Sequence, residues 1–362
     1  MTLTRTAQPR IAILGAGLLG RLLAWRLLLE GYKVYLIEAA GFTNSRAAAF
    51  TAAGMISPLS ELATSEKHIY DLGIKSLALW PLWLKTLTAK RALFFAKGSI
   101  ALAHPQDQIE LEQFYRDISY KLRGESFAAE WLNAAQLKAL EPLLSHFNRA
   151  IYLPNEAHID NRHLLSRLLT AIKDHGGICI DNCPINMIDD EICEQSTIRL
   201  QQHNIANSFD YLIDCRGIGA KTSLNALRGV RGEVLWVETK DVTFQRPIRL
   251  MHPRYKLYAV PKPHQQFIIG ATEIESEDIS AISLQSTLEL SSALYTLHPA
   301  FAEARVIETD TNLRPAYPNN QPHIIQTNKH MSINGLYRHG FLLAPALVAE
   351  SIQRINAQFT PH

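Results

Sequence analysis

A glycine-rich turn near the start of the chain constrains the fold more than any other sequence feature. The aliphatic run Ile11–Leu14 has the composition of a buried strand, and Gly15, Gly17 and Gly20 follow it in a Gly-x-Gly-x-x-Gly pattern. The apolar segment Leu18–Glu30 then continues as a helix. Such glycines permit a tight turn, leave room for a pyrophosphate and let the helix pack closely on the strand. The helix N-terminus attracts phosphate. The pattern predicts a dinucleotide site, with a chance glycine turn as the alternative.

A second strand supports this interpretation. The run Val34–Ile37 ends at Glu38, about 20 residues after Gly17, which is the spacing of the dinucleotide fingerprint. There the carboxylate can accept hydrogen bonds from both ribose hydroxyls of an adenosine. An acidic residue at this position disfavours a 2′-phosphate, so FAD or NAD is favoured over NADP.

Composition excludes several classes of protein. The 362 residues suffice for two domains, and 36 basic against 34 acidic residues without long basic runs argue against nucleic-acid binding. No apolar run is long enough to span a membrane. Residues Met1–Leu29 could pass for a signal peptide, but Arg21 and Arg26 interrupt the apolar stretch. We therefore expect a cytoplasmic protein whose cysteines are thiols, and no metal site.

Periodicity predicts the remaining elements only coarsely. Helical apolar spacing covers four segments, Glu66–Leu87, Gln106–Leu122, Trp131–Leu140 and Leu164–His175. Buried strands are expected at Ile178–Ile180 and Asp210–Gly217, and antiparallel hairpins around Val234–Val237 and Phe267–Ile269.

The segment Arg46–Pro58 consists mainly of small residues, which favour a flexible loop, and it is nearly uncharged. Such a loop can lie flat against a large planar cofactor, although an ordinary Ala/Gly-rich connection is an equal alternative. Five motifs in this and later segments occur in one order: Ala52-Ala53-Gly54-Met55 with Pro58, Val230-Arg231-Gly232-Glu233, Tyr258-Ala259-Val260-Pro261 with Gly270-Ala271-Thr272, Leu313-Arg314-Pro315, and Gly335 to Pro345.

These motifs resemble the D-amino acid oxidase family of flavoproteins and, within it, the glycine oxidases of the thiamine pathway. The resemblance implies an α/β FAD-binding Rossmann-like (doubly wound) domain interleaved with an α+β substrate domain built on an antiparallel sheet. We expect the FAD-binding domain at 1–88, 150–225 and 306–362. The substrate-binding domain is expected at 89–149 and 226–305.

The resemblance also implies which residues contact FAD. They are Gly15, Gly17, Leu19, Gly20, Glu38, Arg46, Thr51, Ala53, Gly54, Met55, Ile185, Gly217, His339, Gly340, Phe341 and Leu342. Related sarcosine-type oxidases attach FAD through a C-terminal Cys, but the last cysteine here is Cys215, and the first histidine is His68. We therefore expect non-covalent FAD.

Three residues are the candidates for catalysis. Arg314 is expected to clamp a substrate carboxylate, because its planar fork matches that group. The Tyr258 hydroxyl would assist it, and Arg338 would place its carbonyl on the amine or its side chain near the flavin. The alternatives are a salt-bridged Arg314, a half-buried strand Tyr258 and a purely structural Arg338.

The chain departs from the family pattern at four positions. The family has a hydroxyl residue at Phe50, His at Leu336 and Asn at His339, and the glycine oxidases have Met at Glu273. Because Glu273 is expected at a solvated turn, and Arg249 and Arg254 in exposed loops, none of the three is assigned to the site.

The expected reaction is oxidation of glycine or other small amino acids or amines, giving an α-oxo acid, ammonia and hydrogen peroxide. One alternative is a dehydrogenase of the same fold that passes electrons to a quinone or carrier protein. Another is a flavin-binding protein without turnover, although such a protein needs no carboxylate clamp. The expected partner is a small amine or amino acid, and homo-oligomerisation stays open.

Overall fold

The chain is organised as two compact units, each made of separate stretches of sequence. A computed structural model describes residues 8–43, 46–87, 91–195, 208–254 and 256–359. Unit 1 comprises Met1–Phe50, Arg162–Val230 and Leu313–His362, and unit 2 comprises Thr51–Asn161 and Arg231–Asn312. Along the chain, three segments of unit 1 alternate with two segments of unit 2. Residues 51–88, 150–161 and 306–312 of the expected FAD-binding domain lie in unit 2, and residues 226–230 of the expected substrate-binding domain lie in unit 1.

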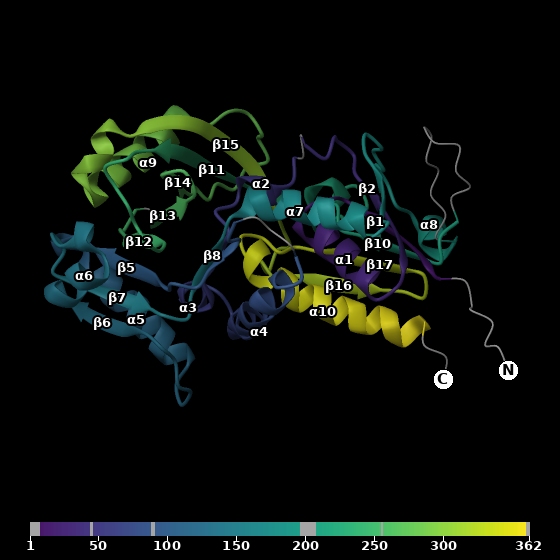
Figure 1. Ribbon diagram of the computed structural model, residues 1–362, viewed down its shortest axis with the longest axis horizontal. Coiled ribbons are helices and arrows are strands. Elements are labelled where there is room, and N and C mark those ends of the chain that lie inside the picture. Colours follow the sequence, from purple (N-terminus) through teal and green to yellow (C-terminus); the bar gives the residue numbers. More distant parts are fainter. Residues whose placement is uncertain (1–7, 44–45, 88–90, 196–207, 255, 360–362) are drawn as a thin grey trace. The chain divides into compact units, whose positions relative to one another are not determined.

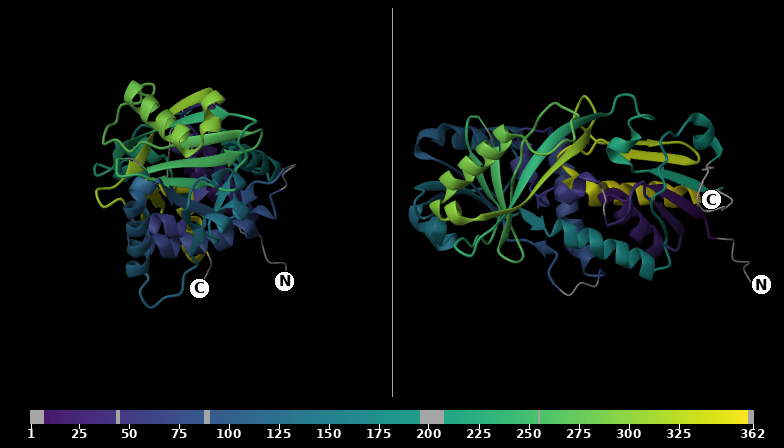
Figure 2. Two further views of the ribbon diagram at one scale, coloured as in Figure 1. Left: turned by 90° about the vertical axis from the view of Figure 1, so that its left-hand side faces the viewer. Right: turned by 90° about the horizontal axis from the view of Figure 1, so that it is seen from above.

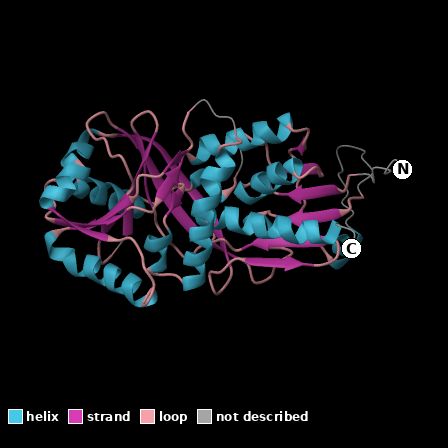
Figure 3. Ribbon diagram, turned by 60° about the horizontal axis from the view of Figure 1, so that its bottom comes forward, coloured by secondary structure: helices cyan, strands magenta, loops and turns pink. Residues whose placement is uncertain are grey.

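Unit 1 is built on a six-stranded sheet that is parallel except at one edge (Figure 1). The strand order is β16 (His323–Gln326), β17 (His330–Asn334), β10 (Tyr211–Asp214), β1 (Arg10–Leu14), β2 (Lys33–Ile37) and β9 (Ile178–Ile180). Its helices are α1 (Leu18–Leu29), α7 (Asn161–Asp174), α8 (Asp190–Gln195) and α10 (Gly340–Phe359), with a 3-10 turn, η3, at Gly217–Ala220. Figure 3 shows the strands side by side with helices across them.

The alternation of side chains along β1 explains the two buried faces of this sheet. Ala12 and Leu14 pack with Tyr35 and Ile37 in one core cluster. Ile13 points the other way, toward α1, which packs against α10. A strand that is apolar on both faces is typical of a parallel sheet covered by helices. The unit is therefore the Rossmann-like domain that the sequence predicted.

Unit 2 is built on an eight-stranded, largely antiparallel sheet, which the two views of Figure 2 show from other sides. Its order is β15 (Arg305–Ala316), β11 (Arg228–Glu238), β14 (Gln266–Gly270), β13 (Lys256–Lys262), β12 (Ile248–Met251), β5 (Ser99–Ala103), β7 (Arg149–Leu153) and β6 (Glu130–Asn133). A small sheet joins β3 (Met55–Ile56), β8 (Ala157–Ile159) and β4 (Phe94–Phe95).

The two faces of the large sheet bury different clusters. One face packs on α9 (Leu284–Leu297), α6 (Ala134–Leu140) and the 3-10 turns η2 (Pro142–Leu144) and η4 (Pro299–Glu303). The other carries a cluster around Trp236 and Val260, and a second one that includes α3 (Pro58–Leu62) and α5 (Gln108–Lys121). The unit also contains α4 (Lys67–Leu84) and the 3-10 turn η1 (Pro105–Asp107), and the boundary between the two units along the chain falls within α2 (Ala48–Thr51). The antiparallel α+β architecture was predicted.

Two local predictions were wrong. The helix expected at Trp131–Leu140 begins only at Ala134, because Asn133 and Gln136 form a reciprocal capping box and residues 130–133 pair with β7 as β6. The segment Arg46–Pro58 is no continuous loop, since it contains α2 and β3. Among the described residues, no helix is long and apolar enough to cross a membrane.

Candidate functional site

The glycine turn of unit 1 has a geometry that side chains would obstruct at two positions. Gly15 has φ +90° and donates its amide to the Ile37 carbonyl at 2.8 Å. A Cβ at Gly15 would lie 2.7 Å from the Cys215 carbonyl oxygen, so β10 approaches this backbone too closely for any side chain. A Cβ at Gly20 would lie 1.9 Å from the Gly15 carbonyl oxygen. Both glycines therefore serve close packing within the protein.

Gly17 differs from the other two glycines, because the protein leaves space beside it. A Cβ there would meet only the Ala47 side chain, at an ordinary contact distance of 3.4 Å. Gly17 is also the N-cap of α1, with no side-chain cap and no acidic residue in the first turn. The unsatisfied amides of a helix N-terminus are suited to phosphate oxygens. The turn thus fits the pyrophosphate of a dinucleotide.

Glu38 lies at the end of β2, where the sequence placed it. Its Oε2 accepts a hydrogen bond from the Ala16 amide at 2.6 Å, and its Oε1 accepts one from the Ala40 amide at 3.3 Å. A carboxylate offers about four lone-pair positions, so capacity remains for ribose hydroxyls. The carboxylate is therefore fixed against the glycine turn and can still take part in nucleotide binding.

Arg21 is a component of this region that sequence reasoning missed. It is 1% exposed, and its guanidinium donates to the carbonyls of Ala16, Leu165 and Phe42 at 2.7, 2.7 and 3.1 Å. Burial lowers the pKa of Arg21 to about 10. The side chain ties the glycine turn to α7 and to the segment after β2. Its charge, within a helix whose only other charged residue is Arg26, was the available signal.

A backbone hydrogen bond joins the Leu-Arg-Pro motif to the closing motif within unit 1. The Tyr337 amide donates to the Pro315 carbonyl at 2.9 Å, and Tyr337 itself has φ +51°. The Arg338 guanidinium lies 5.8 Å from the Tyr337 ring. The residues on either side of this bond include Arg314 and Arg338, so both predicted arginines belong to one structural block.

The closing motif then leads into α10. His339 is buried, its ring meets Tyr337 edge-on at 5.9 Å, and its carbonyl accepts the Leu343 amide at 2.9 Å. Gly340 is the first residue of α10, and Phe341 and Leu342 are buried in its first turn. The predicted cofactor residues 339–342 thus occupy a helix N-terminus, which favours electronegative groups.

The end of β10 organises two further predicted cofactor residues. Arg216 forms a buried ion pair with Asp214 at 2.8 Å and donates to the Ile185 carbonyl at 2.5 Å. The Gly217 carbonyl accepts the Asn334 side-chain amide at 2.9 Å. These contacts place Ile185 and Gly217 beside the end of β10, at the carboxyl edge of the sheet. Leu19 is buried in α1, and Arg46 is exposed.

The other predicted flavin contacts, Thr51, Ala53, Gly54 and Met55, lie in unit 2. The Thr51 hydroxyl donates to Asp310 at 2.7 Å and accepts from Asn312 at 3.1 Å. Gly54 has φ +74°, and its carbonyl accepts the Ile159 amide at 2.8 Å. Met55 pairs with His158 in the small sheet. The segment is therefore bound to its surroundings by side chains and by a β ladder.

Lys262 holds the segment around Ala53 in place, and the sequence did not identify it. It is 8% exposed, and its ammonium donates to the carbonyls of Ala53 and Ile159 and to the Asn161 side chain at 2.8, 2.7 and 3.1 Å. A buried ammonium needs such partners, because an unpaired charge is costly in the interior. Lys262 therefore holds the backbone of residues 53–54 in place.

His158 is a buried histidine next to this segment. It stacks on Phe95 with ring centroids 4.9 Å apart. Burial, with the nearby charges of Lys262 and Lys97, lowers the pKa of His158 to about 3. The imidazole is therefore neutral in the folded protein at ordinary pH.

Tyr258 lies on β13, half-buried, opposite Gly270 of β14 and Arg249 of β12. A Cβ at Gly270 would lie 2.9 Å from the Tyr258 hydroxyl, so the ring leans over this glycine. The expectation that Arg249 occupies an exposed loop was wrong: it is a half-buried strand residue, ion-paired with Glu61 at 2.9 Å. Arg254 and Glu273 are exposed, as expected.

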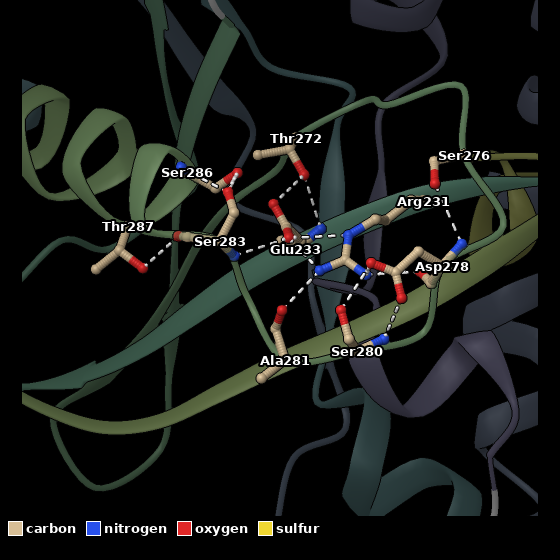
Figure 4. A network of polar contacts seen from close by, with 10 residues as sticks. All are labelled: Arg231, Glu233, Thr272, Ser276, Asp278, Ser280, Ala281, Ser283, Ser286 and Thr287. Atoms are coloured by element: carbon tan, nitrogen blue, oxygen red, sulfur yellow. Dashed lines mark hydrogen bonds and ion pairs between the residues drawn. The ribbon is translucent and has the colours of Figure 1, made fainter.

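The Val-Arg-Gly-Glu motif of β11 takes part in a polar network in unit 2 (Figure 4). Arg231 donates to Glu233 at 2.5 and 2.9 Å, and to the carbonyls of Asp278 and Ala281. Burial raises the pKa of Glu233, but hydrogen bonds from Ser286, Arg231 and Ser283 outweigh it and leave the pKa lowered. The hydrogen bonds from Arg231 to the Asp278 and Ala281 carbonyls, and from the Ser283 amide to Glu233, tie the segment before α9 to β11.

The fold and the glycine turn define the class of protein, and comparison with known sequences assigns it. The family model described as FAD dependent oxidoreductase, DAO, matches residues 10–351. The chain belongs to this family, and the protein is an FAD-dependent oxidoreductase.

The chain is similar over most of its length to three particular members of known sequence or structure. A Rhizobium etli protein with the provisional name thiamine biosynthesis oxidoreductase ThiO is 38% identical over 350 residues, covering 96% of each chain. Glycine oxidase of Pseudomonas aeruginosa is 25% identical over 374 residues, covering 94% of this chain and 92% of the relative. The crystal structure of glycine oxidase from Geobacillus kaustophilus has the same fold, with a TM-score of 0.80, 22% identity and coverage of 96% and 95%.

Proposed function

We propose that this protein oxidises glycine or other small amino acids or amines, using non-covalently bound FAD. The observation that carries the proposal is the link between the Leu-Arg-Pro motif and the closing motif, through the Tyr337 amide and the Pro315 carbonyl. It holds an arginine suited to a carboxylate in the same block as the N-terminus of α10. Similarity to ThiO and to the glycine oxidases supports the same reaction class.

In this proposal the side chains of the protein bind the substrate and orient it. Arg314 binds the substrate carboxylate through two parallel N–H donors, and Tyr258 contributes its hydroxyl. Arg338 orients the amine through its carbonyl or stabilises the flavin through its side chain. The amine must be neutral, so that its lone pair forms the C=N bond as the α-C–H hydride departs. Bound FAD supplies the acceptor for that hydride.

Hydrolysis of the C=N bond and reduction of oxygen complete the reaction. Water adds to the C=N bond and releases an α-oxo acid and ammonia. Molecular oxygen takes up the two electrons and two protons and becomes hydrogen peroxide. Gly15, Gly17, Gly20 and Glu38 would hold the nucleotide part of FAD, with residues 51–55 and 339–342 nearer its ring system.

Replacement of Arg314 tests the proposal. Loss of a charge-assisted pair costs about 1.5–3 kcal/mol, so Arg314→Ala should lower kcat/KM for glycine and sarcosine roughly 10- to 150-fold. Ethylamine, which has no carboxylate, should be affected far less. The matched control is Arg305→Ala, an exposed arginine on the same strand. An unchanged ratio of glycine to ethylamine activity in Arg314→Ala would remove Arg314 from the proposal.

A further inference from the structure

Arg249 and Tyr258 occupy the same face of the large sheet in unit 2. They are directly opposite each other in the antiparallel pair β12–β13. Their neighbours Ile248, Leu250 and Leu257 belong to the cluster on the other face, so the alternation of the strands turns Arg249 and Tyr258 the same way. Ala101 of β5 is the other cross-strand neighbour of Arg249. The two cross-strand neighbours of Arg249 are therefore a small residue and the proposed carboxylate-binding tyrosine.

Among the described residues, Arg249 uses only a small part of its hydrogen-bonding capacity. One Nη donates to Glu61 at 2.9 Å, in a single contact rather than a bidentate one. Its Nε is buried and makes no hydrogen bond to any residue that the structure describes. A guanidinium has five N–H donors, and a buried unsatisfied donor is costly. An additional acceptor would remove that cost.

The residue before Glu61 is fixed by contacts that do not involve Arg249. The preceding Ser60 donates from its amide and its hydroxyl to the buried Glu156 carboxyl, at 2.8 and 3.0 Å. Ser99 donates to the same carboxyl at 2.5 Å. Burial raises the pKa of Glu156, although Arg249 and the two serines oppose the shift. Glu61 is thus the one carboxylate in direct contact with Arg249 among the described residues, and it fixes where the guanidinium lies.

The Tyr258 hydroxyl lies over Gly270 of β14, two strands away from the strand that carries Arg249. Arg249 belongs to β12, and β13 lies between β12 and β14. Two strand spacings separate those strands, which is about 9–10 Å. A ligand with two polar ends separated by a short chain can engage both groups.

We propose that Arg249 is a specificity residue that binds a second carboxylate of the substrate. The substrate class would then include amino- and imino-dicarboxylates, in which one carboxylate lies at Tyr258 and the other at Arg249. This proposal rests on the function proposed above. Glu61 moderates the affinity, because it competes with the ligand for the guanidinium.

Two ethers that cannot be oxidised as amines test binding without turnover. Oxydiacetate has two carboxylates, and methoxyacetate has one on the same backbone. Their dissociation constants are measured on the holoenzyme from the change in flavin absorbance. Oxydiacetate should bind the parent roughly 10- to 100-fold more tightly than methoxyacetate, the range expected for one charge-assisted pair. The corresponding ratio of kcat/KM is measured with iminodiacetate and sarcosine.

Four variants make the test specific to Arg249. R249M should abolish the preference for oxydiacetate, and the double variant R249M/E61Q should do the same without leaving Glu61 unpaired. E61Q alone should strengthen oxydiacetate binding. The matched control is R254M, which replaces an exposed arginine of the same hairpin and should keep the preference.

The outcomes separate this inference from the proposed function. Absence of a preference in the parent, or its retention in R249M or in R249M/E61Q, would overturn the role of Arg249. Sarcosine oxidation would in either case still support the proposed function. Failure of the holoenzyme to oxidise sarcosine, glycine and iminodiacetate would overturn the proposed function and this inference together.

Discussion

Substitution of Gly17 tests whether the glycine turn binds the FAD pyrophosphate. A Cβ at this position meets no protein atom closer than 3.4 Å, so Gly17→Ala should fold. The loss of backbone freedom in the unfolded chain stabilises the variant by about 0.4–1 kcal/mol. Alanine is a poorer N-cap than glycine, which offsets part of that gain. We expect the stability of the apoprotein to change by less than about 1 kcal/mol.

FAD binding should respond differently. The added methyl group occupies the space in which a phosphate approaches the backbone, and overpacking costs about 1–3 kcal/mol. Displacement of the phosphate also weakens its hydrogen bonds to the helix amides. Together we expect a loss of about 2–4 kcal/mol, or roughly 30- to 1,000-fold in Kd.

Two other glycines provide the controls. Gly41→Ala meets nothing within 4 Å and should leave FAD binding and stability near the parent values. Gly20→Ala places a Cβ 1.9 Å from the Gly15 carbonyl oxygen and should destabilise the apoprotein itself, by about 3 kcal/mol or more. FAD affinity is measured by quenching of flavin fluorescence and stability by urea unfolding of the apoprotein. A folded Gly17→Ala variant that binds FAD like the parent would refute this placement of the phosphates.

Three further perturbations follow from the contacts. Glu38→Ala should weaken FAD binding by about 1.5–3 kcal/mol while turnover in saturating FAD stays largely intact; a turnover loss with unchanged affinity would contradict its placement. Lys262→Met leaves the Ala53 and Ile159 carbonyls without their donor and should lower stability by about 2–5 kcal/mol, whereas the exposed Lys240→Met should not. The pKa of His158 is about 3 in the folded protein, and its ordinary value is 6.5. Because the unfolded chain therefore binds the proton more tightly, the free energy of unfolding should fall as the pH drops from 6.5 toward 3. Between pH 7.5 and 5.0 the loss from His158 should be about 2 kcal/mol by urea unfolding, and it should be absent in His158→Phe.

The sequence predicted those parts of the candidate site whose residues lie close together along the chain. Gly15, Gly20 and Glu38 lie within one βαβ unit, so their spacing is visible along the chain. The capping box of α6 was equally local, since Asn133 and Gln136 are three residues apart, but apolar periodicity alone placed the helix start too early.

Residues whose partners are distant in sequence could not be found in this way. Lys262 binds carbonyls 209 and 103 residues away, and Arg249 pairs with Glu61 at a separation of 188. No periodicity reports such pairings, because they depend on strand register and on the docking of α3. In the sequence, these long-range pairings are indicated only by charged residues within apolar strands.

The central claim is that bound FAD is reduced by a small amino acid and reoxidised by oxygen. The most direct measurement is anaerobic titration of the holoenzyme with glycine, sarcosine and iminodiacetate, followed by admission of air. We predict that the flavin absorbance near 450 nm bleaches with at least one of them and returns in air with stoichiometric hydrogen peroxide. Bleaching that recovers only with a quinone would identify a dehydrogenase instead. Flavin that none of these compounds bleaches would contradict the proposed amino acid oxidation.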